Sequence, residues 1–427
     1  MSRNIQPVTG MKDVLSSDIA LWQHVERSAR AVMDAYGYEE IRVPVVEHTE
    51  LFKRAIGEYT DVVEKEMYTF TDQGGDSLTL RPEATAGIVR ATISNGLLRG
   101  ARLKLWCQGP MFRHEKPQKG RFRQFNQIDL EAIGFAGPDV DIEIIALTAR
   151  LWKLLGIARV KLQINSLGTS ESRKAYRALL QDYFRQHLDA LDEDGKRRLE
   201  GNPLRILDSK HPPTQAIVPG APVLTEHLDP ESTAHFAELR AGLDALGIPY
   251  TVNPRLVRGL DYYSRTVFEW ITDALGSQDA VCSGGRYDGL IAQMGGDSTP
   301  AIGFAMGVER VVELVRLAGV VPPVSAPDVF VMAQGDAAQR RALAMAEELR
   351  DALPGRGIFV HCGSAKFKTQ FRRADESGAR LALIVGDDEL ARGVVALKPL
   401  RGAETTQTEH PVAELRARVE EFLRRST

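Results

Sequence analysis

Two segments with alternating apolar and polar side chains lie close together in the first third of the chain. Residues 101–113, ARLKLWCQGPMFR, form the first segment, and residues 123–134, RQFNQIDLEAIG, form the second. Alternation with period two is typical of a half-buried strand, and two such strands joined by a short turn form a hairpin. We therefore expect a long antiparallel hairpin, and the rest of the fold must be built around the sheet that contains it.

The tip of this expected hairpin is strongly basic. Residues 112–127, FRHEKPQKGRFRQFNQ, carry several Arg, Lys and His side chains, although the chain has a net charge of −3. The cluster is either a solvated loop or a contact for a polyanion, which a chain without a basic excess would have to bind through a local patch. His114 is interpreted as a loop residue and not as a general base.

The second strand presents two chemically different faces. Gln127, Asp129 and Glu131 point to one side, whereas Ile128 and Leu130 point to the other. An antiparallel sheet tolerates one polar face in water. The polar side is therefore either a solvated sheet surface or the floor of a polar pocket, and alternation alone leaves both interpretations open.

The chain is long enough for two or three domains, since it has 427 residues. A helix-rich and loop-rich stretch at about 166–245 looks like an insertion between two parts of a larger sheet. Residues 319–327, GVVPPVSAP, have the composition of a linker, and strands alternate with helices beyond them, which is typical of a small α/β domain. We expect one domain at residues 1–325, including the insertion, and a second at 326–427.

Composition excludes several classes of protein. Three widely separated cysteines, Cys107, Cys282 and Cys362, indicate neither a zinc site nor a disulfide framework, which fits a reducing compartment. The first residues lack an apolar signal-peptide core, and no apolar run approaches the ~20 residues of a membrane span. We expect a cytoplasmic protein without a membrane-spanning segment and without a metal site of its own.

Phosphate-binding motifs made of glycine are absent from the sequence. There is no GxxxxGK[ST] loop, and no GxGxxG opens a helix after a strand. If a nucleotide binds, arginines must therefore contact its phosphates, and their planar, permanently charged fork suits that task. Arg113, Arg258 and Arg310 stand at strand ends or turns and are the candidates.

Five segments together resemble the histidyl-tRNA synthetase family of class II aminoacyl-tRNA synthetases, over almost the whole chain. The segments at 37–47 (GYEEIRVPVVE), 112–125 (FRHEKPQKGRFRQF) and 301–311 (AIGFAMGVERV) resemble motifs 1, 2 and 3 of the class. The segments at 258–270 (RGLDYYSRTVFEW) and 283–290 (SGGRYDGL) resemble the two histidine-specific signatures. The resemblance implies an α+β fold with an antiparallel six- to seven-stranded catalytic sheet, flanking helices, a helical insertion and a C-terminal α/β anticodon-binding domain.

The resemblance also implies an activity, that of a histidine–tRNA ligase. The carboxylate of histidine would attack the α-phosphate of ATP, giving histidyl-adenylate and pyrophosphate, and histidine would then pass to the 3′ end of tRNA(His). Arg113 and Arg258 would act at the α-phosphate as catalytic residues, and Arg310 would bind the γ-phosphate. Mg²⁺ would bridge the departing phosphates, because phosphoryl chemistry needs positioning and charge stabilisation more than covalent catalysis.

The histidine pocket follows from the same resemblance. Glu83, Thr85 and Gln127 would receive the amino group, whereas Glu131 and Tyr263 would bind the imidazole. Ala84 stands where relatives usually carry glycine. On this basis the polar face of the second hairpin strand is better interpreted as a pocket floor. The full set of residues expected at the histidine pocket is Glu83, Ala84, Thr85, Gln127, Glu131, Tyr262, Tyr263 and Tyr287.

Partners are implied as well. The family contacts tRNA(His) through the motif 2 hairpin and the last domain, and it forms homodimers. Pro44, inside residues 39–47, lacks a ladder donor and so predicts a strand at a sheet edge or a subunit interface. The residues expected to touch tRNA are Gln118, Lys119 and Arg121 at the hairpin tip, and Lys366 and Arg372 in the last domain.

Two other functions compete with this one. A non-catalytic regulatory paralogue of the first enzyme of histidine biosynthesis looks like the catalytic core without the anticodon domain, and its signature residues have drifted. Here Arg258 and Arg310 are present and a further domain follows residue 325. A plain RNA-binding module would explain the basic tip but not the expected pocket residues, so the ligase is the function that we favour.

Overall fold

The computed structural model describes residues 5–58, 60–100, 102–117, 120–207, 209–257, 260, 262–276, 280–322, 326–402 and 405–425. The chain forms two compact units, Met1–Pro322 and Pro323–Thr427, and each has hydrophobic clusters of its own. None of the helices in the described part of the chain combines the length and the apolar character that a membrane crossing requires.

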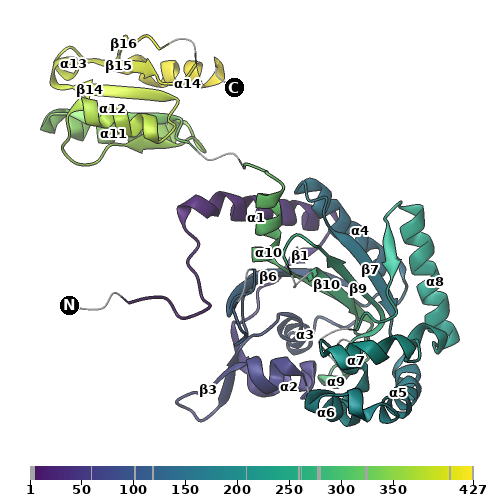
Figure 1. Cartoon of the computed structure of the whole chain (residues 1–427). Coiled ribbons are helices and arrows are strands. Elements are labelled where there is room, and N and C mark those ends of the chain that lie inside the picture. Colours follow the sequence, from purple (N-terminus) through teal and green to yellow (C-terminus); the bar gives the residue numbers. More distant parts are fainter. Residues whose placement is uncertain are drawn as a thin grey trace. The chain divides into compact units, whose positions relative to one another are not determined.

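An eight-stranded mixed sheet forms the centre of the first unit (Figure 1), with the order β1-β5-β6-β11-β10-β9-β7-β8. The outermost pairs, β1 with β5 and β7 with β8, are parallel, and the five inner pairs are antiparallel. The expected purely antiparallel sheet of six to seven strands is therefore wrong, because two very short strands add to its edges in the parallel sense. The strands are β1 (Glu39–Glu40), β5 (Leu103–Phe112), β6 (Gln124–Ile133), β7 (Lys161–Ser166), β8 (Tyr250–Val252), β9 (Ser264–Ile271), β10 (Ala280–Arg286) and β11 (Ala301–Gly307).

The expected long hairpin is confirmed. Strands β5 and β6 pair antiparallel from Leu103↔Ile133 to Phe112↔Gln124. The opposite edge of β6 pairs with β11, which places β6 inside the sheet. Gln127, Asp129 and Glu131 of β6 are buried, so their face is not a solvated surface.

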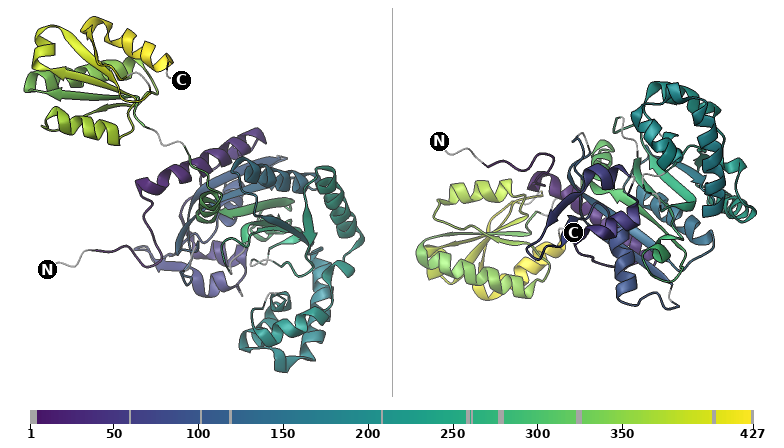
Figure 2. Two further views of the ribbon diagram at one scale, coloured as in Figure 1. Left: turned by 45° about the horizontal axis from the view of Figure 1, so that its top comes forward. Right: turned by 90° about the horizontal axis from the view of Figure 1, so that it is seen from below.

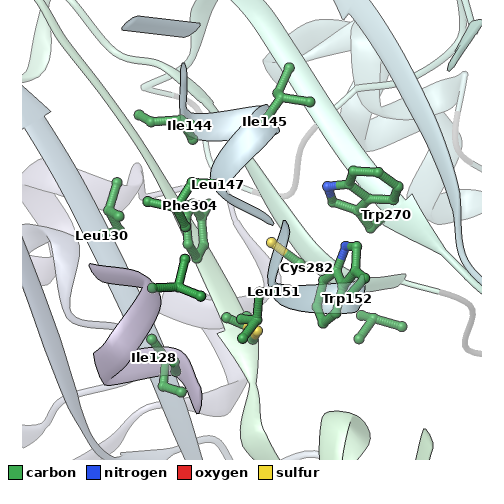
Figure 3. Close-up of a cluster of buried hydrophobic side chains, with 14 of the residues drawn as sticks. Ile128, Leu130, Ile144, Ile145, Leu147, Leu151, Trp152, Trp270, Cys282 and Phe304 are labelled. Atoms are coloured by element: carbon green, nitrogen blue, oxygen red, sulfur yellow. The ribbon is translucent and has the colours of Figure 1, made fainter. Parts of the chain in front are cut away.

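Helices cover one face of the sheet with a large apolar cluster. Side chains of α4 at helical spacing, among them Ile144, Leu147 and Leu151, pack on the apolar face of β6 and on β9, β10 and β11 (Figure 3). Burying each such side chain stabilises the fold by roughly 1.5–3 kcal/mol relative to leaving it in water. The helices that contribute to this cluster are α1 (Ser16–Ala35), α4 (Asp139–Leu154), α8 (Pro230–Ala245) and α10 (Val308–Leu317).

The strand expected at residues 39–47 is divided in two. β1 belongs to the large sheet, whereas β2 pairs with β4 in a separate three-stranded sheet, and Pro44 stands between them. Arg81 joins the two parts, since its guanidinium donates to the carbonyls of Val43 and Pro110 at 3.1 and 2.9 Å. The elements on this side are β2 (Val46–His48), β3 (Tyr68–Thr71), β4 (Ser77–Leu80), α2 (Thr49–Ile56), η1 (Val62–Glu66), α3 (Thr85–Ser94) and α9 (Leu290–Gln293).

A helical segment connects β7 to β8. Most of its helices form a lobe that extends away from the sheet in the left view of Figure 2, whereas α8 packs on the sheet with α4. Asp229 caps α8 through the backbone N–H of Ser232 at 2.8 Å and also accepts from the hydroxyls of Thr169 and Ser172 at the start of α5. The segment contains α5 (Ser170–Arg185), α6 (Glu193–Gly201), α7 (Pro212–Ile217), α8 and the 3₁₀ turns η2 (Leu188–Ala190), η3 (Pro203–Ile206), η4 (Val218–Gly220) and η5 (Leu224–Glu226).

The second unit is a five-stranded sheet with the order β13-β12-β14-β15-β16. β12, β13 and β14 are parallel, and β15 and β16 extend the sheet antiparallel. Helices α11 and α14 pack on one face and α12 on the other. The elements are β12 (Val329–Gln334), β13 (Ile358–Val360), β14 (Leu381–Gly386), β15 (Val394–Pro399), β16 (Thr408–Pro411), α11 (Asp336–Ala352), α12 (Phe367–Glu376), α13 (Asp387–Ala391), η6 (Val412–Glu414) and α14 (Leu415–Arg425).

Candidate active site

A cavity of about 320 Å³ opens on the polar face of β6. Its walls come from β6, β9, β10 and β11, from the segments that follow β4 and β5, from two tyrosines before β9 and from the first turn of α10. Its polar and charged lining residues are Glu83, Thr85, Arg113, Glu115, Arg121, Gln127, Glu131, Tyr262, Tyr263, Glu269, Ser283, Tyr287, Glu309 and Arg310.

The register between β6 and β11 shows which residues lie at each end of the cavity. On β6, Gln127 pairs with Gly307, next to the start of α10, whereas Glu131 pairs with Gly303. Four residues of antiparallel strand separate Gln127 from Glu131, which is roughly 14 Å along the strand. The arginine of α10 therefore belongs to one end and the carboxylate of Glu131 to the other.

Glu131 lies at the end of the cavity opposite the arginine of α10. It is completely buried, and its Oε1 accepts from the hydroxyl of Thr85 at 2.6 Å, while its Oε2 accepts from the hydroxyl of Tyr287. Burial raises the pKa of Glu131 to about 8; the two hydrogen bonds act to lower it, and the negative charge of Glu83 raises it.

Gly303 leaves the space that Glu131 occupies. A Cβ built at position 303 would collide with Oε2 of Glu131 and with the backbone carbonyl of Leu130. The glycine is thus needed because the carboxylate crosses the neighbouring strand directly above its backbone.

Two buried polar atoms of the cavity residues have no hydrogen-bond partner among the described residues. Oε1 of Glu83 accepts from the backbone N–H of Ala86 at 2.9 Å, but its buried Oε2 has no partner, and neither has the buried Oε1 of Gln127. Burial raises the pKa of Glu83, although hydrogen bonds from Ala86 and Thr85 act against it. Unsatisfied buried acceptors are costly, so these atoms suit a donor brought by a ligand.

Three tyrosines form the wall opposite the strand. The ring of Tyr262 lies 4.7 Å from that of Tyr263 and 5.6 Å from that of Tyr287, measured between ring centroids. All three are buried. Burial raises the pKa of Tyr262 and of Tyr287, so their hydroxyls stay protonated and can act as donors.

Arginines stand at the other end of the cavity. Nε of Arg113 donates to the carbonyl of Pro82 at 2.9 Å, and its guanidinium lies 5.4 Å from the ring centroid of Phe125. Arg310 donates to the carbonyl of Ala280 and, at 3.4 Å, to that of Gly120 at the hairpin tip. Both side chains line the cavity, whereas Arg258 lies outside the described residues.

The structure thus brings most of the expected histidine-pocket residues to one cavity, with one exception. Ala84 does not line it. Its methyl group is buried in an apolar cluster with Ile88, Leu105 and Met111. The side chain at position 84 therefore faces the apolar cluster and not the cavity.

Four polar residues of the cavity were not predicted, namely Glu115, Glu269, Ser283 and Glu309. Ser283 donates to Glu269 at 3.0 Å, and both carboxylate oxygens of Glu309 accept from the backbone N–H of Asn126, at 2.9 and 3.0 Å. Burial raises the pKa of Glu309, and the bonds from Asn126 lower it. The alternation of side chains along β9 and β10 places Glu269 and Ser283 on the cavity face. This alternation is visible in the sequence and could have identified both residues.

Asp129, on the same face as Gln127 and Glu131, lies deeper than the cavity. It is completely buried, and neither carboxylate oxygen has a hydrogen-bond partner among the residues that the structure describes. Burial, followed by the charges of Glu131 and Glu83, raises its pKa. It therefore forms part of the support under the floor and not of the floor itself.

The residues expected to touch tRNA are dispersed. Arg121 lines the cavity and forms an ion pair of 2.8 Å with Glu115, whereas Gln118 and Lys119 lie outside the described residues. In the second unit, Lys366 precedes α12 and lines a separate cavity of about 460 Å³, and Arg372 lies on the exposed side of α12, 3.7 Å from Glu376. In the described part of the chain no cluster of three or more His, Cys, Asp or Glu side chains is placed to hold a metal ion.

Comparison with known proteins agrees with this architecture. Residues 10–311 match the family model of histidyl-tRNA synthetase, and residues 328–422 match that of an anticodon-binding domain. The structure is similar to that of apo histidyl-tRNA synthetase from S. aureus, with a TM-score of 0.81 and 35% sequence identity over 98% of this chain and 99% of that one.

Two more distant structures share the fold. Histidyl-tRNA synthetase from Nostoc sp. PCC 7120 has a TM-score of 0.66 and 21% identity over 99% of this chain and 100% of that one. An ATP phosphoribosyltransferase regulatory subunit/histidyl-tRNA synthetase from Bacillus halodurans C has a TM-score of 0.64 and 22% identity over 90% of this chain and 99% of that one.

The large mixed sheet with its helices, together with the additional C-terminal domain, is the fold of a class II aminoacyl-tRNA synthetase. Within that class, the chain belongs to the histidyl-tRNA synthetase family.

Proposed function

We propose that this protein is a histidine–tRNA ligase that activates L-histidine with ATP and transfers it to the 3′ end of tRNA(His). The observation that carries the proposal is the arrangement around Glu131. A buried carboxyl is held by Thr85 and Tyr287 at one end of a cavity whose other end carries Arg113 and Arg310. This arrangement supports a polar side-chain pocket beside a wall whose arginines would bind phosphate.

Glu131 and Tyr263 are proposed to bind the imidazole, and Tyr262 and Tyr287 to enclose it. An imidazole has two nitrogens, and the carboxyl and the phenol offer a hydrogen bond to each. A site built in this way rejects apolar amino acids of similar size, because they would leave buried polar groups unpaired. The free acceptors of Glu83 and Gln127 suit the ammonium group of the substrate, which Thr85 would also contact.

The activation step is an in-line displacement at phosphorus. A carboxylate oxygen of histidine attacks the α-phosphorus of ATP, the bond to the bridging oxygen breaks, and pyrophosphate leaves with the electron pair. Arg113 is proposed to hold the α-phosphate and Arg310 the γ-phosphate, since the guanidinium fork pairs with phosphate oxygens. Arg258, from the first histidine signature, is proposed to share the charge at the α-phosphate. Preorganised charge of this kind is a major source of catalysis.

ATP enters such a site as its Mg²⁺ complex. Mg²⁺ prefers oxygen ligands and is usually held by one or two carboxylates together with substrate phosphates. We propose that Glu309, next to Arg310 in the first turn of α10, and Glu269 on β9 would hold the ion, since both line the cavity. The ion would neutralise charge on the phosphates that leave.

Transfer to tRNA involves the rest of the chain. We infer that residues 1–325 form the catalytic domain and residues 326–427 the anticodon-binding domain. The hairpin tip, with Gln118, Lys119 and Arg121, is proposed to contact the acceptor end, and Lys366 and Arg372 the anticodon arm. A homodimer in the cytoplasm is proposed as well: Pro44 interrupts an edge strand, and all three cysteines are free thiols.

The regulatory paralogue remains the second candidate, because one structure of similar fold has that description in its name. Against it, Arg113 and Arg310 line the cavity and a complete α/β unit follows the first. A regulatory subunit does not need a phosphate-binding wall next to its amino-acid pocket.

The test is ATP–pyrophosphate exchange with each of the standard amino acids, without tRNA. We expect exchange with histidine alone, and Glu131→Gln should reduce it, whereas the exposed Glu238→Gln should leave it unchanged. Folded protein that exchanges pyrophosphate with no amino acid would reject the ligase function and favour the regulatory one.

A further inference from the structure

Arg286, the residue immediately before Tyr287, is a fully buried cation outside the cavity. Its exposure is 0%, and it is the last residue of β10. Consecutive residues of an extended backbone point to opposite sides. Tyr287 accordingly lines the cavity, while the side chain of Arg286 reaches α4 on the other side of the sheet.

The guanidinium of Arg286 is held by acceptors from three parts of the chain. Nε donates to Oδ2 of Asp141 at 3.1 Å, and Nη2 lies 2.7 Å from Oδ1 of the same carboxylate. Nη1 donates to the carbonyl of Phe135 at 3.0 Å and to Oδ1 of Asp288 at 3.2 Å, and Nη2 donates to the carbonyl of Gly137 at 2.5 Å. Only arginine offers donors in this planar, forked arrangement, because a lysine ammonium is a single point charge.

These contacts connect the end of β10 to the segment that follows β6. Phe135 and Gly137 follow directly after β6, the strand that carries Glu131. Tyr287 donates its hydroxyl to Glu131, and its neighbour Arg286 holds the carbonyls at the end of the same strand. The position of the tyrosine relative to the carboxyl is thus fixed from both sides of the sheet.

A further contact joins Asp141 to the helical segment between β7 and β8. Nε2 of His235, on α8, lies 2.7 Å from Oδ2 of Asp141, and the imidazole is 7% exposed. An ionised Asp141 accepts only, so Nε2 of His235 carries the proton in this contact. A residue of the insertion therefore supports the carboxylate that orients Arg286.

We propose that Arg286, Asp141 and His235 form a positioning network that sets the specificity of the amino-acid pocket by fixing the hydroxyl of Tyr287 against Glu131. None of the three lines the cavity, so their effect is indirect. The proposal rests on the proposed histidine-binding role of Glu131 and Tyr287. It gives Arg286, the arginine of the segment SGGRYDGL, a role that accounts for its burial and its contacts.

The first test is Arg286→Lys, which keeps the charge and removes the fork. Histidine-dependent ATP–pyrophosphate exchange should show a KM for histidine raised by about 10- to 100-fold, since small misplacements in a pocket have effects of this size. The KM for ATP should stay unchanged. A matched control is Arg159→Lys, whose exposed arginine pairs with Asp273 at 2.7 Å and whose kinetics should equal those of the wild type.

A double-mutant cycle with Tyr287→Phe separates positioning from general stability. If Arg286 acts through the tyrosine hydroxyl, the effect of Arg286→Lys on the histidine KM should nearly vanish in the Tyr287→Phe background. Effects that multiply independently, or a histidine KM that does not change in folded Arg286→Lys, would overturn the proposal.

A second variant keeps the test decisive where Arg286→Lys does not fold. His235→Phe removes the donor to Asp141 from the insertion side, and His235→Gln restores an N–H donor of similar reach. We expect a raised histidine KM for His235→Phe and recovery for His235→Gln; equal values for both would reject the network. Absence of exchange in the wild type would instead reject the ligase function itself.

Discussion

At the scale of single residues, the proposed recognition of histidine depends on how closely Glu131 crosses β11. Its carboxylate occupies the space where a side chain at position 303 would begin. Gly303→Ala should therefore displace Glu131 and raise the histidine KM by about 100-fold or more, with a smaller effect on ATP. Gly201→Ala, where an added Cβ meets nothing within 4 Å, is the matched control. Unchanged kinetics in Gly303→Ala would show that the carboxylate sits elsewhere in the working enzyme.

The buried carboxyls also make stability depend on pH. The pKa of Glu131 is raised from 4.5 to about 8 by burial, so the folded chain keeps a proton that the unfolded chain releases between these values. This contribution is complete below pH 4.5 and is lost as the pH rises towards 8. The raised pKa values of Glu83 and Asp129 act in the same direction.

Urea unfolding of the ligand-free protein should therefore become easier between about pH 5.5 and about pH 8.5. Glu131→Gln should flatten this dependence, by at most about 1.4 kcal/mol per pH unit. All four tryptophans lie in the first unit, so their fluorescence reports on the unit that contains Glu131. An identical pH dependence in wild type and variant would mean that Glu131 is already ionised in the folded state.

At the scale of elements, Asp229 holds the two long helices of the insertion together. Burial acts to raise the pKa of Asp229, but hydrogen bonds from Ser172 and Ser232 outweigh it and lower the pKa. A depressed pKa means that the stabilisation is present above the unfolded value of 3.8 and is lost only as the pH falls below it. The cap is therefore fully effective at neutral pH.

Asp229→Ala should destabilise the insertion by about 1–2 kcal/mol, the usual cost of losing an N-cap. Asp229→Asn keeps a capping oxygen and should lose less, and Asp34→Ala on the exposed side of α1 should lose nothing. Limited proteolysis within residues 170–245 measures the difference. Equal cleavage rates in all three variants would show that the cap contributes nothing.

Elements differ in how far local sequence determines them. The hairpin of β5 and β6 was predictable because alternation and a short turn are local signals, and the burial of its polar face followed once a family was recognised. The edge strand β8 was not, since three residues carry no period and its parallel partner is distant in the chain. For β1, an edge strand at residues 39–47 was expected, but its length of only two residues and its parallel pairing with β5 were not. Glu309 was missed for a similar reason: its contact with Asn126 joins residues far apart in sequence. Alternation assigned Asp129 to the correct face but contains no information about depth.

At the scale of the whole molecule, the two units have separate cores. A chain that ends at Pro322 should keep histidine-dependent exchange within about twofold of the wild type, because no cavity residue comes from the second unit. Charging of tRNA should fall about a hundredfold, since two linked binding modules lose their avidity when one is removed. Aminoacylation and exchange assays on the same preparation measure both. Loss of both activities together would mean that the second unit also supports the first.

The position of β6 inside the sheet has a consequence for motion. The backbone N–H groups of residues 127–131 belong to a strand that is paired on both edges, so their deuterium uptake should require cooperative opening of the first unit. Among the described residues of the hairpin beyond Phe112, the amides of His114 and Arg123 donate to the carbonyls of Glu66 and Gly10 instead of to neighbouring strands of the large sheet, so these amides should exchange sooner. The proposed histidine-binding floor would then stay rigid while substrates enter and products leave.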